Sequence, residues 1–142
     1  MPSDFVAYDE IQVGDKASFS KTISESDVYQ FAGIIGDFNE LHVNQVAAES
    51  SLFKSRVVHG CLADSLVSTV LGMKYPGKGT IFLEKSVSYI KPVYIGDTLT
   101  AEITVAEKRE KGRVLFDVSY YNQDGEEVIK GTALVIAPRK EQ

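Results

Sequence analysis

Residues 60–73, GCLADSLVSTVLGM, restrict the fold of this chain more than any other segment. Their spacing predicts a helix whose apolar side chains point around most of its circumference, with Asp64 as its single charged residue. A helix that is apolar on nearly all sides is stable in water only when other structure surrounds it. The rest of the chain is therefore expected to wrap around this helix.

The chain after Thr80 has the patterns of β-strands. Apolar and polar residues alternate there, and the strands are expected over residues 81–90, 99–105, 114–120 and 128–136. Turn-forming pairs separate them at 96–97, 111–112 and 124–125, and these short separations favour antiparallel pairing. One buried helix inside a long, curved antiparallel sheet predicts an α+β domain.

The N-terminal half predicts one more strand and one more helix. Residues 17–23 alternate as a short strand, and Ser24 is a candidate N-cap for an amphipathic helix that ends near Gly33 or Gly36. Residues 37–58 are irregular, with a helical turn expected around 47–50. A connection of this length in a compact domain is more often functional than not.

Length and composition are those of an ordinary globular protein, and one domain is expected over residues 1–142. The net charge is −5 and no block of basic residues occurs, which argues against a nucleic-acid partner. No signal peptide and no membrane span are expected, so a cytoplasmic protein is predicted. Cys61 is the only cysteine, which excludes an intramolecular disulfide, and it is expected to be a small buried residue.

Two stretches suggest a catalytic site. Asp37 and His42 lie five residues apart in the irregular segment, where they can converge on one water molecule and exchange its proton. Gly60 begins the predicted helix, so its N–H, with the helix dipole behind it, suits a carbonyl oxygen that gains negative charge. Ser68 lies about two turns further along the same helix face, where its hydroxyl can orient a substrate.

The stretch FAGIIGDFNELH resembles the signature of the MaoC-like, R-specific enoyl-CoA hydratases, which runs roughly G/E-D-x-N-P-L-H. VVHGCLADSLVSTVLG is similar to the central helix of that family, and KPVYIGDTLTAEITV is similar to one of its hairpins. The similarity extends from about Tyr8 to Val135. It implies the hot-dog fold and reversible syn addition of water to trans-2-enoyl-CoA thioesters, giving the (R)-3-hydroxyacyl product without a cofactor.

The resemblance also implies roles for individual residues. Asp37 and His42 hold the catalytic water, the Gly60 N–H polarises the thioester carbonyl, and Ser68 falls where some members have an active-site serine. The chain departs from the family at Glu40, which replaces the proline of the signature.

Asn39 and Leu71 complete the candidate site. Asn39 is expected to stabilise the loop between Asp37 and His42 through local hydrogen bonds, beside the substrate. Leu71 follows Ser68 by three residues, so the two side chains share a helix face and are candidates to line an acyl tunnel. A role for Leu71 in the core is the alternative.

Other interpretations remain open at this point. Asp64 is expected to face solvent or a dimer seam, but a carboxylate on the central helix also fits an acyl-CoA thioesterase or an acyl-carrier-protein dehydratase. A non-catalytic subunit that binds acyl thioesters is a third possibility. His59 is expected to hydrogen-bond the backbone.

Expected partners are limited to an acyl-CoA substrate and a second copy of the chain. Two histidines and one cysteine show no metal-ligand spacing, so no metal is expected. A curved sheet around one helix leaves an open edge, and a homodimer or an assembly of dimers is expected to cover it.

Overall fold

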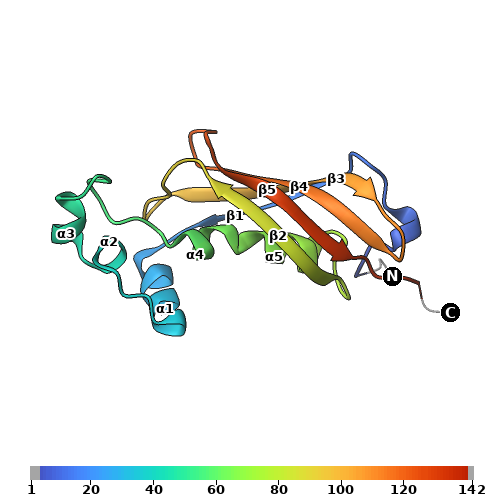
Figure 1. Ribbon diagram of the computed structural model, residues 1–142, viewed down its shortest axis with the longest axis horizontal. Coiled ribbons are helices and arrows are strands. Elements are labelled where there is room, and N and C mark those ends of the chain that lie inside the picture. Colours follow the sequence, from blue (N-terminus) through green and yellow to red (C-terminus); the bar gives the residue numbers. More distant parts are fainter. Residues whose placement is uncertain (1–3, 141–142) are drawn as a thin grey trace.

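A curved antiparallel sheet wraps around a central helical segment in the computed structural model, which describes residues 4–140 (Figure 1). The strand order is β1-β3-β4-β5-β2, and all neighbours are antiparallel. The strands are β1 (Lys16–Thr22), β2 (Ile81–Tyr89), β3 (Thr98–Lys108), β4 (Arg113–Tyr121) and β5 (Glu127–Ile136). The predicted α+β class, hot-dog architecture and antiparallel pairing are confirmed.

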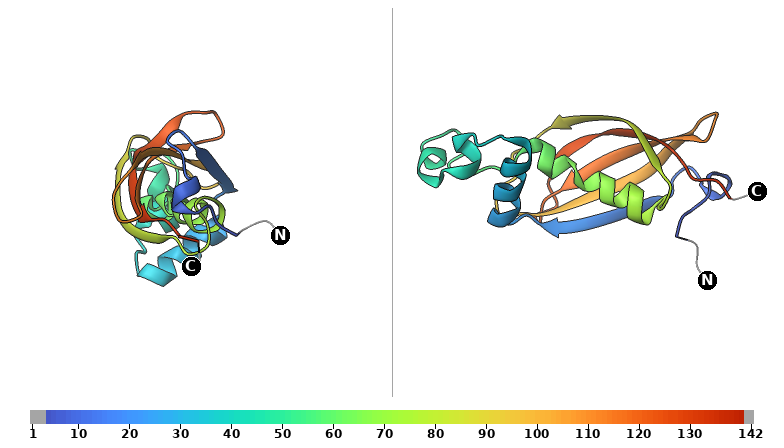
Figure 2. Two further views of the ribbon diagram at one scale, coloured as in Figure 1. Left: turned by 90° about the vertical axis from the view of Figure 1, so that its right-hand side faces the viewer. Right: turned by 90° about the horizontal axis from the view of Figure 1, so that it is seen from below.

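The central helical segment lies along the concave face of the sheet (Figure 2). It consists of α4 (Gly60–Asp64), α5 (Leu66–Thr69) and a π-helical turn, η2 (Val70–Lys74), with only Ser65 between α4 and α5. Val67 and Leu71 are 1% exposed, and they share a buried cluster with Ile103 and Phe116 of the sheet. Burying each such side chain contributes roughly 1.5–3 kcal/mol, so the sheet stabilises the helix that the sequence predicts.

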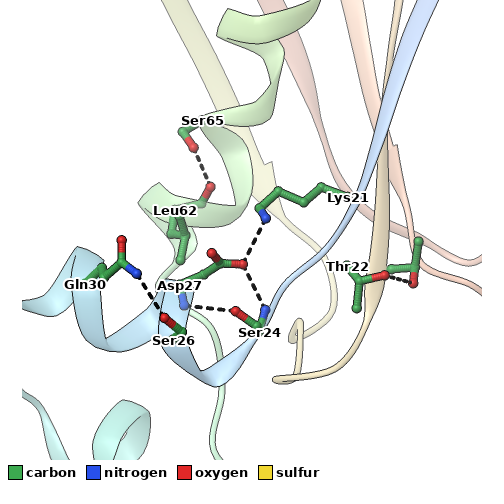
Figure 3. Close-up of polar contacts among 9 residues, drawn as sticks. Lys21, Thr22, Ser24, Ser26, Asp27, Gln30, Leu62 and Ser65 are labelled. Atoms are coloured by element: carbon green, nitrogen blue, oxygen red, sulfur yellow. Dashed lines mark hydrogen bonds and ion pairs between the residues drawn. The ribbon is translucent and has the colours of Figure 1, made fainter.

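Helix α1 (Glu25–Ile35) begins with a capping box, drawn in Figure 3. Ser24 Oγ accepts the Asp27 N–H at 3.0 Å, and the Asp27 carboxylate accepts the Ser24 N–H at 2.9 Å. Lys21 Nζ lies 3.1 Å from the same carboxylate. The helix ends at Gly36, which has a φ of 82° and donates to Ala32 O, so the chain turns sharply just before the candidate site.

Three short helices extend beyond one end of the sheet, opposite the chain termini (Figures 1 and 2). They are α1, α2 (Glu40–Val43) and α3 (Gln45–Glu49), and we call residues 24–56 the overhang. The predicted helical turn around 47–50 corresponds to α3, whereas α2 is too short to have a detectable hydrophobic period. After the overhang, the Val58 N–H donates to Val93 O at 2.7 Å, so the chain returns beside the connection between β2 and β3.

Near the N-terminus, a short 3₁₀ turn, η1 (Tyr8–Glu10), precedes β1. Within residues 4–140, every helix is too short or too polar to cross a lipid bilayer.

Candidate active site

The structure brings Asp37 and His42 together where the overhang meets the start of α4. His42 Nε2 lies 3.9 Å from Asp37 Oδ2. This separation is too long for a hydrogen bond, but one water molecule between the two atoms would contact both. The pair can therefore hold a single water by both of its protons.

Asn39 orients the carboxylate of Asp37. The Asn39 N–H donates to Asp37 Oδ1 at 3.1 Å, and the Asn39 side chain caps α2 by accepting the Leu41 N–H at 3.0 Å. With Oδ1 held in this way, Oδ2 is the oxygen that faces His42. The Asp37 side chain is 47% exposed, so a substrate can reach it.

A backbone carbonyl determines which nitrogen of His42 carries the proton. His42 Nδ1 lies 2.6 Å from Val57 O, and because a carbonyl only accepts, Nδ1 must be the donor. Nε2 then presents its lone pair toward Asp37, which is the tautomer that a general base requires.

His59 packs directly against this pair. Its side chain is 2% exposed, and its Nε2 lies 2.9 Å from Asp37 O, which confirms the expected bond to the backbone. Its ring stacks on that of His42, with centroids 3.8 Å apart and an angle of 23° between the planes. The sequence pattern did not indicate this stacking.

Asp37, His42 and His59 each offer one possible metal ligand, and these atoms lie within 4.8 Å of one another. One nitrogen of each histidine ring already bonds to a backbone carbonyl oxygen. Because the two rings are stacked, the lone pairs of their other nitrogens lie in nearly parallel planes. Ligands of one ion must instead converge on a single point. The cluster therefore fits a shared water better than a metal ion.

A cavity of about 590 Å³ lies at the start of α4. Gly60 and Val57 line it, so it contacts both the start of α4 and the residue whose carbonyl binds His42. Helix α4 has no side-chain cap, which leaves the Gly60 N–H available. Cys61 also lines the cavity and is exposed. The prediction that Cys61 is buried is wrong, because the first turn of α4 faces this cavity rather than the core.

Asp64 corrects a second expectation. It is 3% exposed, and its carboxylate is bound by Lys85 Nζ and the Tyr89 hydroxyl. Burial and the hydrogen bond to Asp64 raise the pKa of Tyr89. The expectation that Asp64 faces solvent or a dimer seam is wrong, because Lys85 and Tyr89 of β2 point toward the helix and bury its carboxylate within the chain. Lys85 and Tyr89 were not identified from the sequence, although strand alternation places both on one face of β2.

Ser68 and Leu71 lie apart from the cluster. Ser68 is exposed on α5, and Leu71 is 1% exposed within the buried core. Neither residue lines the cavity beside Gly60. Asp37 and His42 do not line it either, but His59, which precedes Gly60, bonds to Asp37 O and stacks on His42. Asn39 bonds to Asp37, so Asp37, Asn39, His42 and Gly60 are joined by contacts that Ser68 and Leu71 lack.

Comparison with known proteins identifies relatives of similar length. The model for the MaoC like domain family matches residues 10–125. The chain is 40% identical over 133 residues to an (R)-specific enoyl-CoA hydratase of Rhodospirillum rubrum, covering 94% of this chain and 92% of that one. It is 39% identical over 129 residues to an (R)-specific enoyl-CoA hydratase of Aeromonas caviae, covering 90% and 96%.

A solved structure with a similar fold is the unliganded R-hydratase PhaJ1 from Pseudomonas aeruginosa. Its TM-score is 0.92 at 37% identity, over 96% of this chain and 88% of that chain.

Proposed function

Because the chain belongs to the MaoC-like domain family, we propose that it is an (R)-specific enoyl-CoA hydratase that adds water reversibly to trans-2-enoyl-CoA thioesters. The main support from its own residues is the 3.9 Å gap between His42 Nε2 and Asp37 Oδ2, which suits one bridging water. A cavity of about 590 Å³, a volume in the range for small-molecule sites, is lined by Gly60 and by Val57, whose carbonyl binds His42.

His42 is the general base in the proposed reaction. Its Nδ1–H is held by Val57 O, so Nε2 takes one proton from the water, while Asp37 Oδ2 accepts a hydrogen bond from the O–H that remains. The water oxygen then bonds to C3 of the enoyl group. The nearby Asp37 carboxylate stabilises the positive charge that His42 gains.

Gly60 supplies the electrophilic contact. Its N–H donates to the thioester oxygen, which draws electron density from C3 and stabilises the enolate that forms when water adds. The proton on His42 then passes to C2, on the face that the water attacked. One H₂O is consumed, C3 gains OH and C2 gains H, so the addition is syn and needs no cofactor.

The carboxylate of Asp64 is a poor candidate for the thioesterase alternative. A nucleophile or base must present a free oxygen to substrate, whereas Lys85 and Tyr89 bind both oxygens of Asp64. The backbone carbonyl of Asp64 also accepts the Tyr120 hydroxyl at 2.6 Å. We therefore assign Asp64 to the support of β2 against the helix.

A homodimer is part of the proposal, since the helix covers the inner face of β2 only in part. Phe82, Lys85 and Tyr89 pair in register with Val135, Ala133 and Ile129, which are all buried. Yet Phe82 is 39% and Tyr89 is 55% exposed, because the helix lies nearer β1 and β3 (Figure 2). A second copy that pairs at this edge would cover these side chains and close the sheet edge.

The stereochemistry of the reverse reaction tests the proposal. The two enantiomers of 3-hydroxybutyryl-CoA are supplied separately, and formation of the conjugated thioester is followed by its absorbance. We expect dehydration of the (R) enantiomer alone. Dehydration of the (S) enantiomer, or of neither, would refute the assigned activity.

A further inference from the structure

His59 contacts the backbone or side chain of each proposed catalytic group. Its Nε2 bonds to Asp37 O at 2.9 Å, its ring stacks on His42, and it is the N-cap residue that precedes Gly60. The ring of Phe31 packs against the same ring in a T-shaped arrangement, with centroids 5.2 Å apart. At 2% exposure the side chain is closed to substrate, so any effect on the reaction is exerted through its neighbours.

The hydrogen bonds of His59 argue against a role in packing alone. Because Asp37 O only accepts, Nε2 carries the proton and Nδ1 is left with a lone pair. Nδ1 is buried and has no hydrogen-bond partner within residues 4–140. A buried unpaired acceptor lowers stability, and a phenylalanine ring would fill similar space without it. The donor at Nε2 is therefore the property that distinguishes histidine here.

Stacking on His59 restricts the ring of His42. The Val57 carbonyl holds one edge of that ring, and the face of His59 prevents it from tilting away. Both contacts direct Nε2 toward Asp37 Oδ2.

We infer that His59 is a positioning residue that holds the Asp37 backbone and the His42 ring in one arrangement beside Gly60. This inference rests on the proposed hydratase function for its kinetic test. The contacts themselves can be tested without it.

Three variants separate the two contacts of His59. His59→Gln retains an N–H donor for Asp37 O but loses the ring. His59→Phe retains the stacked ring but loses the donor. His59→Leu loses both. Val28→Ala is the matched control, since Val28 is fully buried in α1 and lies outside the site.

We expect His59→Leu to lower kcat for crotonyl-CoA by about tenfold to a hundredfold, because small displacements of catalytic groups have effects of this size. The KM should change by less than about threefold, since His59 does not touch substrate. His59→Gln and His59→Phe should each recover part of the lost kcat. Val28→Ala should lower thermal stability and keep kcat.

A folded His59→Leu variant with the kcat of the wild type would overturn the inference. So would a loss of kcat in Val28→Ala that matches the loss in His59→Leu at equal stability. Should the wild-type protein fail to hydrate crotonyl-CoA, the proposed function fails, and the spectroscopic test below still decides the role of His59.

The spectroscopic test uses the wild-type protein, which has only two histidines. Nitrogen-15 NMR of the imidazoles should show opposite tautomers, with the proton on Nδ1 of His42 and on Nε2 of His59. In His59→Leu, the His42 ring is free to tilt away from Val57 O, so its signal should move toward the average of two exchanging tautomers. A His59 ring protonated on Nδ1, or a His42 signal unchanged by the substitution, would contradict the inference.

Discussion

Gly60 and Tyr89 are in direct contact: a Cβ atom at position 60 would lie 2.8 Å from Cε1 of the Tyr89 ring. The ring is held by its hydroxyl, which donates to the buried carboxylate of Asp64. Asp64 and Tyr89 thereby fix one wall of the cavity at the proposed oxyanion site. The contact explains why position 60 is glycine, since a larger residue would collide with the Tyr89 ring. The N–H alone does not explain it, because every residue except proline has one.

We therefore predict that Gly60→Ala lowers kcat/KM by about tenfold or more, because the new methyl displaces the start of α4 from its catalytic position. A second substitution, Tyr89→Ala, removes the obstructing ring. The double variant should recover activity relative to Gly60→Ala, and a double-mutant cycle measures the coupling. If the losses of the two single variants simply add in the double variant, contact with the Tyr89 ring is not the reason that Gly60→Ala lowers activity.

Leu71→Ala should reduce the free energy of unfolding by about 2–5 kcal/mol, the range for truncating a buried leucine. Leu71 is 1% exposed and packs in the core cluster, away from the cavity beside Gly60. The ratio of kcat/KM for hexenoyl-CoA and crotonyl-CoA should therefore stay constant. A shift of that ratio toward hexenoyl-CoA would instead place Leu71 in the acyl site.

Light scattering should show a dimer at micromolar concentration, and Phe82→Glu should dissociate it. A charge at position 82, on the partly exposed inner face of β2, would have to be buried without a partner in the dimer. The control is Val13→Glu, which replaces an apolar residue that is 64% exposed in the turn before β1. A monomeric wild-type protein, or equal dissociation by both variants, would disprove the assigned interface.

The capping box of α1 predicts a pH dependence of stability. The hydrogen bond from the Ser24 N–H lowers the pKa of Asp27 below its usual 3.8. Partial burial of the carboxyl opposes this change, and Lys21 lowers the pKa further. A carboxyl whose pKa is lower in the folded state stabilises the fold above the unfolded pKa, and it loses that contribution as the pH falls through the folded pKa.

Asp27→Asn should therefore reduce the free energy of unfolding by roughly 0.3–1 kcal/mol at pH 7, the usual effect of an acidic group at a helix N-terminus. The difference from the wild type should shrink as the pH falls below about 4. Urea unfolding across this pH range measures it. A difference that does not change with pH would show that the charge of Asp27 is not involved.

The sequence predicted the elements whose patterns are long and periodic. The helix over residues 60–73 appears as α4, α5 and η2, and the alternation of Leu99, Ala101, Ile103 and Val105 is that of the buried face of β3. In these elements local periodicity and tertiary burial agree. The convergence of Asp37 and His42 also followed from a short local stretch.

Features that depend on distant neighbours were missed or reversed. Asp64 and Cys61 exchange their expected environments, because burial on the helix depends on where β2 passes. Stacking of His42 on His59 joins two segments that the local pattern does not relate. The pairing of Tyr89 with Asp64 needs the same knowledge of the sheet. Sequence periodicity predicts which face of a helix or strand is apolar, but it does not predict which other element packs against that face.

The most direct test is the hydration of crotonyl-CoA by the wild-type protein, Asp37→Asn and His42→Ala, with free thiol measured in the same reaction. The wild type should bleach the ultraviolet absorbance of the conjugated thioester without releasing thiol. Each variant should remain folded and lose about two to four orders of magnitude in kcat, the range for general acid–base groups. Thiol release by the wild type, or wild-type turnover in either variant, would contradict the proposed hydratase mechanism.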